Sequence, residues 1–267
     1  MPRPRVLITG ASAGIGAEFA RLFAANGYDL ILVARREDKL NTLRDELAST
    51  GAHVVVIAKD LSLKTAAKSL YQELKSINLP VDVLVNNAGV AYGGAFTAMD
   101  TDTVQQMVLL NAATLASLTR MFVGDMVARG SGRILNISSL SAFQAVPSMS
   151  LYAATKAFVL SFTEGLAEEL RGTGVTVTAL CPGFTDTQMV HEIAHTGGPM
   201  PEIPAFLISD VKSVVKEGYD ACMNGEVVHV PGLANQISAM WSQTQPRWLV
   251  RTLSGMFSRQ FLPGRRQ

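Results

Sequence analysis

Two side chains of one short segment could carry acid–base chemistry. Tyr152 and Lys156 are four residues apart, so on a helix both would lie on one face. A phenol with a pKa near 10 is a poor proton donor and acceptor at neutral pH, but a nearby ammonium stabilises the phenolate and lowers that pKa. This spacing is common by chance. However, Ser139 lies thirteen residues before Tyr152, at the end of an apolar run, and its hydroxyl strengthens the interpretation of Tyr152 and Lys156 as catalytic residues.

A glycine-rich segment near the N-terminus could bind a phosphate group. It runs from Thr9 to Gly16 (TGASAGIG), directly after an apolar run and before a helical pattern. Glycines allow a tight turn and the close approach of a pyrophosphate, and the helix N-terminus supplies N–H donors and the positive end of a dipole. The position between strand and helix favours a dinucleotide site over a purely structural turn.

Two arginines follow the second apolar run, where a dinucleotide site contacts the adenosine ribose. Sites for NAD usually carry Asp or Glu there. This chain has Ala34, Arg35 and Arg36, and the two guanidiniums could bind a 2′-phosphate by charge-assisted hydrogen bonds. Alternatively, both arginines only begin a solvated helix with Glu37 and Asp38. The missing acid favours NADP(H) as the cofactor.

Short β-branched runs alternate with longer helical patterns through most of the chain. This pattern is typical of buried parallel strands connected by helices. We therefore predict a doubly wound, Rossmann-type α/β fold with about seven parallel strands and helices on both faces. The predicted strands are Arg5–Thr9, Asp29–Val33, His53–Ala58, Val81–Val85, Arg133–Ser138, Val175–Leu180 and Val227–Val230, and the predicted helices are Gly16–Asn26, Glu37–Thr50, Leu63–Ile77, Thr101–Arg129, Ser150–Arg171 and Ser209–Met223.

Length and composition favour a single domain over residues 1–267. Hydrophobic residues make up 48% of the chain and charged residues 17%, which excludes wholesale disorder. The net charge of +1 gives no reason to expect nucleic acid as a partner. Cys181 and Cys222 cannot build a disulfide framework, and we find no signal peptide or run of about 18 apolar residues. These features predict a cytoplasmic protein with no membrane-spanning segment.

Taken together, these segments resemble the short-chain dehydrogenase/reductase family. The glycine spacing GxxxGxG is similar to that of the compact members, whereas extended members have a different spacing and a longer C-terminal domain. The matching residues follow the family's order. They are Thr9 to Gly16, Asp60, Leu61, Asn86 to Gly89, Asn111, Ser139, Tyr152 to Lys156, Pro182, Gly183 and Thr187.

The resemblance implies a role for each of these residues. Tyr152 would donate and accept the proton, Ser139 would hold the reacting oxygen, and Lys156 would lower the pKa of Tyr152 and bind the nicotinamide ribose. Asn111 would hold a water molecule in a proton relay, and Thr187 would position the nicotinamide carboxamide. The implied cofactor-binding residues are Gly10, Ser12, Gly14, Ile15 and Gly16 for the pyrophosphate, Asp60 and Leu61 for the adenine, Asn87, Ala88 and Gly89 for the adenosine ribose, and also Tyr152, Lys156, Pro182, Gly183 and Thr187.

One position departs from the pattern of many NADP-preferring relatives. Ala13 stands where they have a basic residue, so the 2′-phosphate would be recognised by Arg35, Arg36 and the Ser12 hydroxyl. We expect an NADP(H)-dependent reductase of a hydrophobic ketone or aldehyde. A 3-oxoacyl or hydroxysteroid reductase, a non-catalytic NADP-binding regulator and a peripheral membrane protein are alternatives. The expected walls of the substrate pocket are Phe143, Met149, Phe184, Met189 and Val190, with Met200, Ile203, Phe206 and Leu207 in a lid over residues 188–208.

His191 and His195 form an HExxH motif, which on a helix can bind zinc. The motif falls in the expected lid, and the candidate third ligands Glu202, Glu217 and His229 lie in different predicted elements. We therefore expect no metal site.

The C-terminal extension, residues 232–267, is basic. It contains five arginines and no acid, and Leu249, Val250, Leu253, Met256 and Phe257 form an apolar stripe on a predicted helix. Such a stripe packs on its own protein or on a second subunit more often than it lies on an anionic membrane, so packing is favoured. The family resemblance implies a homodimer or homotetramer, assembled through the long helices at 101–129 and 150–171.

Overall fold

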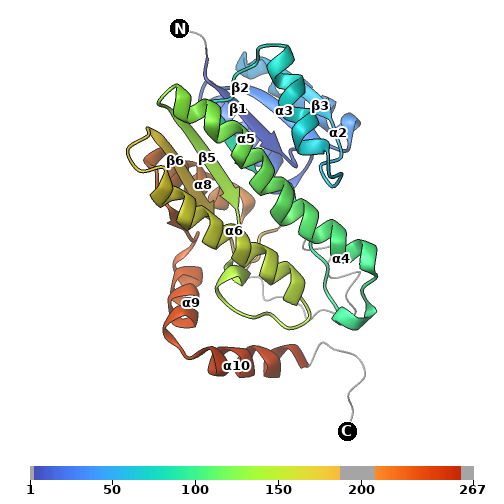
Figure 1. Ribbon diagram of the computed structural model, residues 1–267, viewed down its shortest axis with the longest axis vertical. Helices are drawn as coiled ribbons and strands as arrows, with labels where there is room; N and C mark the ends of the chain where they lie inside the picture. Colours follow the sequence, from blue (N-terminus) through green and yellow to red (C-terminus); the bar gives the residue numbers. More distant parts are fainter. Residues whose placement is uncertain (1–2, 187–207, 260–267) are drawn as a thin grey trace.

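Seven parallel strands form the central sheet, as the alternating pattern predicts. In the computed structural model, which describes residues 3–186 and 208–259, the strand order is β3-β2-β1-β4-β5-β6-β7 (Figure 1). The strands are β1 (Arg5–Thr9), β2 (Asp29–Ala34), β3 (Val54–Ala58), β4 (Val83–Asn86), β5 (Gly132–Ile137), β6 (Val175–Leu180) and β7 (Val228–His229).

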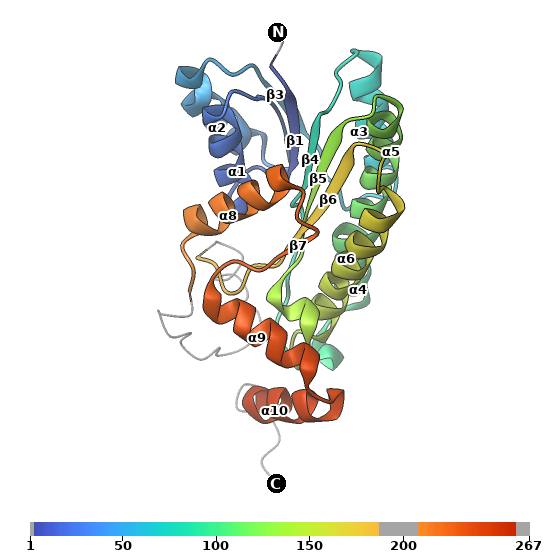
Figure 2. The same cartoon turned by 90° about the vertical axis from the view of Figure 1, so that its left-hand side faces the viewer.

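Helices cover both faces of this sheet, which confirms the predicted doubly wound architecture. Helices α1, α2 and α8 lie on one face, and α3, α5 and α6 lie on the other (Figure 2). The α-helices are α1 (Gly14–Ala25), α2 (Glu37–Leu47), α3 (Ala66–Ser76), α4 (Thr101–Val108), α5 (Leu115–Ala128), α6 (Ser150–Glu169), α8 (Val211–Asn224), α9 (Leu233–Thr244) and α10 (Arg247–Arg259).

Strand β2 shows why the strands appear in the sequence as continuous apolar runs. Leu30 and Leu32 point into the core beneath α1, α2 and α8, and Ile31 and Val33 point into the core on the opposite face. All four side chains are fully buried. A strand buried on both faces needs apolar residues at every position, because successive side chains alternate between the faces.

The predicted helix over 101–129 is continuous but irregular. A π-helical stretch, Leu109–Thr114, joins α4 to α5 and contains the buried Asn111. Contrary to our expectation, this helix is long and apolar enough to cross a membrane by length and mean hydropathy alone. However, Leu118, Phe122 and Met126 are buried in the core on one face of the sheet, as in the core helix of a globular domain.

The order of the strands reverses direction between β1 and β4. The chain continues outward from β1 to β2 and β3 on one side, and from β4 through β7 on the other. In open α/β sheets, loops at the carboxyl ends of such neighbouring strands separate and leave a crevice. The loops that follow Thr9 and Asn86 therefore meet at the place where this fold binds ligands.

The C-terminal helices α9 and α10 lie at the end of the molecule opposite the N-terminus (Figures 1 and 2). Helix α9 contacts the 3₁₀ helix Leu140–Phe143. The predicted stripe of α10 is only partly covered, because Val250 is buried whereas Leu253 and Met256 are exposed.

Several predicted features lie outside the described residues. These are Thr187, the HExxH histidines His191 and His195, and nearly all of the expected lid at 188–208. Within residues 3–186 and 208–259, no three His, Cys, Asp or Glu side chains are arranged to hold a metal ion.

Candidate active site

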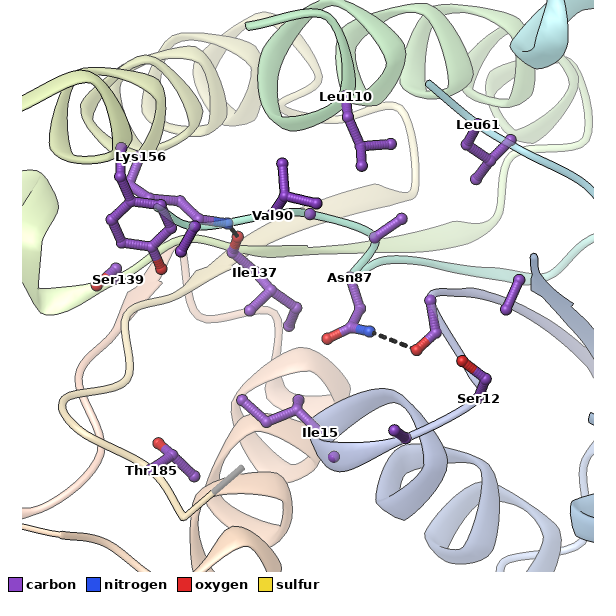
Figure 3. A pocket seen from close by; sticks show the side chains of 18 of the residues that line it. Ser12, Ile15, Leu61, Asn87, Val90, Leu110, Ile137, Ser139, Lys156 and Thr185 are labelled. Atoms are coloured by element: carbon purple, nitrogen blue, oxygen red, sulfur yellow. Dashed lines mark hydrogen bonds between the residues drawn. The ribbon is translucent and has the colours of Figure 1, made fainter. Parts of the chain in front are cut away.

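A cavity of about 490 Å³ opens at the carboxyl ends of the strands (Figure 3). One end is lined by Ser12 and Ile15 from the glycine-rich turn, and the other by Ser139 and Lys156. Segments that are far apart in the sequence thus meet in one crevice, at the point where the strand order reverses.

The glycine-rich turn brings bare backbone to the cavity. Gly10 and Gly14 have φ angles of +67° and +54°, which glycine adopts at little cost. At Gly16, a Cβ atom would stand 2.3 Å from the Gly10 carbonyl oxygen, so only glycine fits there. The N-cap of α1, Ala13, supplies no side-chain hydrogen bond to the first turn of the helix. An anion can therefore take up these N–H groups.

Thr9 and Asn87 connect the loops that follow β1 and β4. The Thr9 hydroxyl accepts from the N–H groups of Asn87 and Ala88, both at 3.0 Å, and donates to the Val85 carbonyl at 3.2 Å. The Asn87 Nδ2 donates to the carbonyls of Thr9 and Gly10 at 3.0 and 3.1 Å. Asn87 was expected in the site, whereas the role of Thr9 was missed, because it is simply the last residue of an apolar strand.

Cationic side chains gather at the end of the cavity near β2 and β3. Arg35, Arg36 and Lys59 line it beside Ala34, and Arg36 Nη2 donates to the Ser12 hydroxyl at 3.4 Å. Burial alone would raise the pKa of Asp60. Hydrogen bonds from Ser62 and the charge of Arg35 outweigh burial and hold that pKa below its usual value. This end of the cavity suits an anionic group.

The expected acid–base residues meet at the opposite end. Helix α6 carries Tyr152 and Lys156, and Ser139 follows β5. The Lys156 Nζ donates to the Ile137 carbonyl at 2.8 Å and lies 5.6 Å from the centre of the Tyr152 ring. Ser138, which was not expected in the site, donates from its hydroxyl to the Lys156 carbonyl at 2.8 Å and so joins β5 to α6.

The pKa values at this end differ from the expectation that Lys156 lowers the pKa of Tyr152. Burial raises the pKa of Tyr152, and a hydrogen bond with the Ser139 side chain lowers it in part. Burial also lowers the pKa of Lys156 to about 8, against a weaker opposing influence of the Cys181 thiol. The physical reason is desolvation, because burial disfavours the charged form of each group, and the hydrogen bond from the Lys156 Nζ to the Ile137 carbonyl does not offset it.

Asn111 is fully buried and does not line the cavity. Its Nδ2 donates to the Val90 carbonyl at 2.8 Å and to the Thr155 hydroxyl at 3.2 Å, and its Oδ1 accepts from the Val90 N–H at 2.9 Å. The side chain therefore fixes Val90, which does line the cavity, and connects the π-helical stretch to α6.

The loop after β6 closes the catalytic end. Pro182, Gly183 and Thr185 line the cavity there, and the Thr185 hydroxyl donates to the Gly183 carbonyl at 3.2 Å. A Cβ atom on Gly183 would lie 2.7 Å from the Oδ1 of Asn235 in the first turn of α9. The C-terminal extension thus packs directly behind the wall of the cavity.

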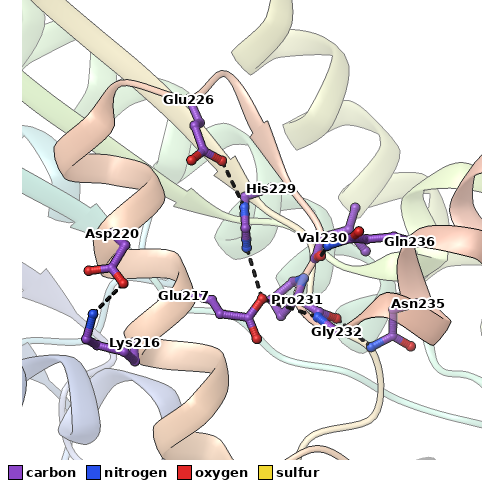
Figure 4. A network of polar contacts seen from close by, with 10 residues as sticks. All are labelled: Lys216, Glu217, Asp220, Glu226, His229, Val230, Pro231, Gly232, Asn235 and Gln236. Carbon is purple, nitrogen blue, oxygen red and sulfur yellow. Dashed lines mark hydrogen bonds and ion pairs between the residues drawn. The ribbon is translucent and has the colours of Figure 1, made fainter.

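A polar network holds the start of α9 in place (Figure 4). The Nδ1 of His229 lies 2.9 Å from Glu226, and its Nε2 lies 3.2 Å from Glu217. Glu217 also accepts from the Gly232 N–H at 3.3 Å, and Asn235 Nδ2 donates to the Pro231 carbonyl at 2.8 Å. These contacts connect α8, β7 and α9 beside the site.

Most of the predicted site residues lie together in the crevice. Gly16 and Asn111 stand behind its wall, and Thr187 lies outside the described residues. Phe143, Met149 and Phe184 were expected as pocket walls but are not among the lining residues, and Phe143 packs instead against a small core near Leu160. The lining residues that sequence reasoning missed are Lys59, Val90, Ala91, Tyr92, Leu110, Ile137, Ser138 and Thr185.

Comparison with known proteins identifies the family. The family model described as short chain dehydrogenase matches residues 4–197. The chain belongs to the short-chain dehydrogenase family. It is 35% identical to the ketoacyl reductase HetN of Nostoc sp. over 179 residues, which are 67% of this chain and 62% of HetN. The match thus spans less than two thirds of that relative.

Two solved structures, a short-chain dehydrogenase and an alcohol dehydrogenase, resemble the chain over nearly its whole length. One, from Sphingobium yanoikuyae in complex with NADPH, has a TM-score of 0.81 and 32% identity, with 96% of this chain and 95% of that chain covered. The other, a bulky-bulky ketone specific alcohol dehydrogenase from Comamonas testosteroni, has a TM-score of 0.78 and 30% identity, with 97% and 95% covered.

Short-chain dehydrogenases use NAD(P)(H), and the crevice fits such a dinucleotide. Its glycine cradle has no space for additional Cβ atoms, because one on Gly10 would stand 2.8 Å from Asn87 Nδ2. The N-terminus of α1 offers N–H donors, and the cations near Ala34 offer charge for a phosphate. The residues present are thus those that a nicotinamide dinucleotide requires.

Proposed function

We propose that the chain is an NADP(H)-dependent oxidoreductase that interconverts a carbonyl compound and an alcohol. The observation that carries the proposal is one crevice with the glycine-rich turn and the cations toward one end and Tyr152, Ser139 and Lys156 at the other. Membership of the family and the bound NADPH of the solved relative support it.

A bound nicotinamide would supply the hydride for reduction, or accept it in the reverse direction. The chain's own residues handle the proton. In reduction, the Tyr152 hydroxyl gives its proton to the substrate oxygen, while Ser139 holds that oxygen by a hydrogen bond. Once formed, the phenolate on Tyr152 would lie near the Lys156 ammonium, whose Nζ is 5.6 Å from the ring centre, and an opposite charge at that place would favour it. Positioned acid–base groups of this kind contribute roughly 10²–10⁴-fold in rate.

The test of this activity is NADPH consumption in the presence of a ketone panel, with Tyr152→Phe as the decisive variant. The variant retains the ring and its packing but has no proton to give. Turnover should fall to a few per cent or less, roughly the 10²-fold or greater effect expected for loss of a general acid. If Tyr152→Phe turned over as fast as the wild type, the proposed proton donor would be wrong.

The proposed preference for NADP(H) over NAD(H) is based on the residues that line the end of the crevice near β2. Ala34 is buried where an acid would otherwise bind the ribose, and Arg35 and Arg36 line the cavity beside it. A charge-assisted hydrogen bond is worth about 1.5–3 kcal/mol, so Arg35→Ala should lower the NADPH to NADH ratio of kcat/KM by roughly ten- to hundred-fold. The control is Arg44→Ala, which removes an exposed guanidinium paired with Asp45 on α2. Equal efficiency of the wild type with both cofactors would refute the preference.

A hydrophobic ketone or aldehyde is the proposed substrate. Val90, Ala91, Tyr92 and Leu110 line the cavity and give it an apolar wall. The name of the Comamonas relative, which is specific for bulky-bulky ketones, supports this class. The name of HetN favours a 3-oxoacyl substrate instead. Comparing kcat/KM for bulky ketones, 3-oxoacyl thioesters and oxosteroids would separate these classes.

We further propose a homodimer or homotetramer in the cytoplasm. Val108 on α4 and Phe158 on α6 are large, apolar and exposed, so these helices offer a surface for a second copy. The free thiols of Cys181 and Cys222 suit a reducing compartment. Light scattering would test the assembly, since a monomer at assay concentration contradicts it, and fractionation of cells would test the location.

A further inference from the structure

Helix α9 presents its apolar side chains outward. It packs on the protein through small residues, Ala239 and Ser242, which are buried. Large apolar residues recur at helical spacing on the opposite side, and all are exposed: Leu233, Ile237, Met240 and Trp241. Leu233 is 72% exposed and Met240 is 68% exposed. The usual arrangement of a surface helix is thus inverted.

Helix α10 adds a second line of exposed apolar side chains and positive charge. Val250 is the buried contact to the protein, and Trp248 and Met256 are exposed in one line with Thr252 along the side facing away from it. Trp248 is 62% exposed. Arg247 and Arg251 form the adjacent line on the same helix. We call the exposed side chains of α9 and α10 named in these two paragraphs the arm surface.

Charge decides which occupant fits the arm surface. The sequence has no acid after Glu226 but five arginines, whereas residues 1–226 have a net charge of −4. A two-fold contact between two arm surfaces would bring like charges together. An anionic lipid surface instead accepts arginines, exposed tryptophan and apolar side chains at the same time.

The position of the arm surface at one end of the molecule allows it to contact a lipid bilayer. In both views, α10 lies across the end of the molecule with the sheet and its covering helices on one side of it (Figures 1 and 2). Both tryptophans flank the turn between α9 and α10, and tryptophan favours the membrane–water boundary.

We propose that the arm surface docks the protein on an anionic lipid bilayer, with Trp248 and Met256 in the interface and Arg247 and Arg251 against lipid phosphates. This goes beyond the proposed reductase activity and does not depend on it. The cytoplasmic leaflet, which is anionic, is a surface of this kind. The apolar stripe of the sequence favoured packing on the protein itself or on a second subunit, but the described part of the chain leaves Trp248, Leu253 and Met256 exposed.

The test is co-sedimentation of the full chain with two kinds of vesicle. We expect binding to vesicles of phosphatidylglycerol mixed with phosphatidylcholine, no binding to phosphatidylcholine alone, and release by high salt. Each arginine near an anionic surface contributes about five-fold in affinity, so Arg247→Gln with Arg251→Gln should weaken binding about twenty-five-fold. Trp248→Ser should weaken it further without changing the salt dependence.

The matched control is Lys64→Gln with Lys68→Gln, which removes two exposed cations at the same spacing but far from the arm. Thermal melting checks that each variant is folded. The proposal is overturned if the wild type does not sediment with anionic vesicles, or if the lysine pair weakens binding as much as the arginine pair. It is also overturned if light scattering without lipid shows an oligomer that Ile237→Ser and Met240→Ser convert to monomer, because a second copy would then cover the surface.

Discussion

Replacing Lys156 by methionine should stabilise the protein while it abolishes turnover. Lys156 is only 6% exposed, and burial lowers its pKa from 10.5 to about 8. Since one pKa unit corresponds to about 1.4 kcal/mol, the buried ammonium destabilises the folded state by about 3 kcal/mol at neutral pH. Methionine has a similar length and no charge. It leaves the Ile137 carbonyl without its donor, which costs about 1–2 kcal/mol.

The net stabilisation is therefore about 1–2 kcal/mol, or a rise in Tm of roughly 2–6 °C for a domain of this size. The pH dependence gives a sharper test. Because the folded pKa lies below the unfolded pKa, the destabilisation is fully present below pH 8 and is relieved as the pH rises from about 8 toward 10.5. The Tm advantage of Lys156→Met should shrink across that window.

The assay is thermal melting of both proteins between pH 7 and 10, without cofactor, alongside NADPH turnover. Lys68→Met is the matched control, because Lys68 is exposed on α3 and its charge is hydrated in both states. Its Tm difference from the wild type measures the effect of removing an exposed lysine and is subtracted at each pH. A Lys156→Met protein that melts several degrees lower at every pH would refute the reasoning, since the ammonium would then stabilise the fold.

Three further results are expected. Thr9→Val should lower the free energy of unfolding in urea by roughly 2–4 kcal/mol, because the N–H groups of Asn87 and Ala88 lose their acceptor, whereas Thr9→Ser should stay near wild type. NADPH titrated into Tyr152→Phe should bind nearly as to the wild type, since only the proton donor is lost. Dialysis against a chelator should leave turnover unchanged, and about one zinc per chain in fresh protein would contradict this.

The sheet could be predicted from the sequence because its five inner strands, β2, β1, β4, β5 and β6, are buried on both faces. The prediction was less accurate at the end of β4, where a polar residue enters the core. The range Val81–Val85 stops before Asn86, which belongs to β4 and is buried. Asn86 Nδ2 donates to Asn136 Oδ1 at 2.9 Å and to Thr119 Oγ1 at 3.0 Å. An apolar pattern cannot foresee a polar residue whose partners come from other elements.

Site residues that belong to short sequence motifs could be predicted, whereas those that tertiary contacts bring to the cavity could not. The glycine turn and the Tyr152 segment are local patterns, and the crevice contains both. Val90 and Thr185 lie in loops without a pattern of their own. The π-helical stretch that places Asn111 behind Val90 has no signal in a helical periodicity, since both flanking segments are ordinary α-helix.

The C-terminal extension shows why the surface of a protein is harder to predict than its core. An apolar stripe in a sequence indicates which side chains should leave water but not what covers them. In α10, Val250 is buried and Leu249 is partly buried, whereas Leu253 and Met256 are exposed. The start of α9 is nevertheless tightly held, since Glu217 binds the Gly232 N–H and Asn235 stands against Gly183 in the cavity wall. Helix α9 therefore contacts the cavity wall at its first turn and carries exposed apolar side chains along its other side, and only the first of these two features could be connected with a motif of the sequence.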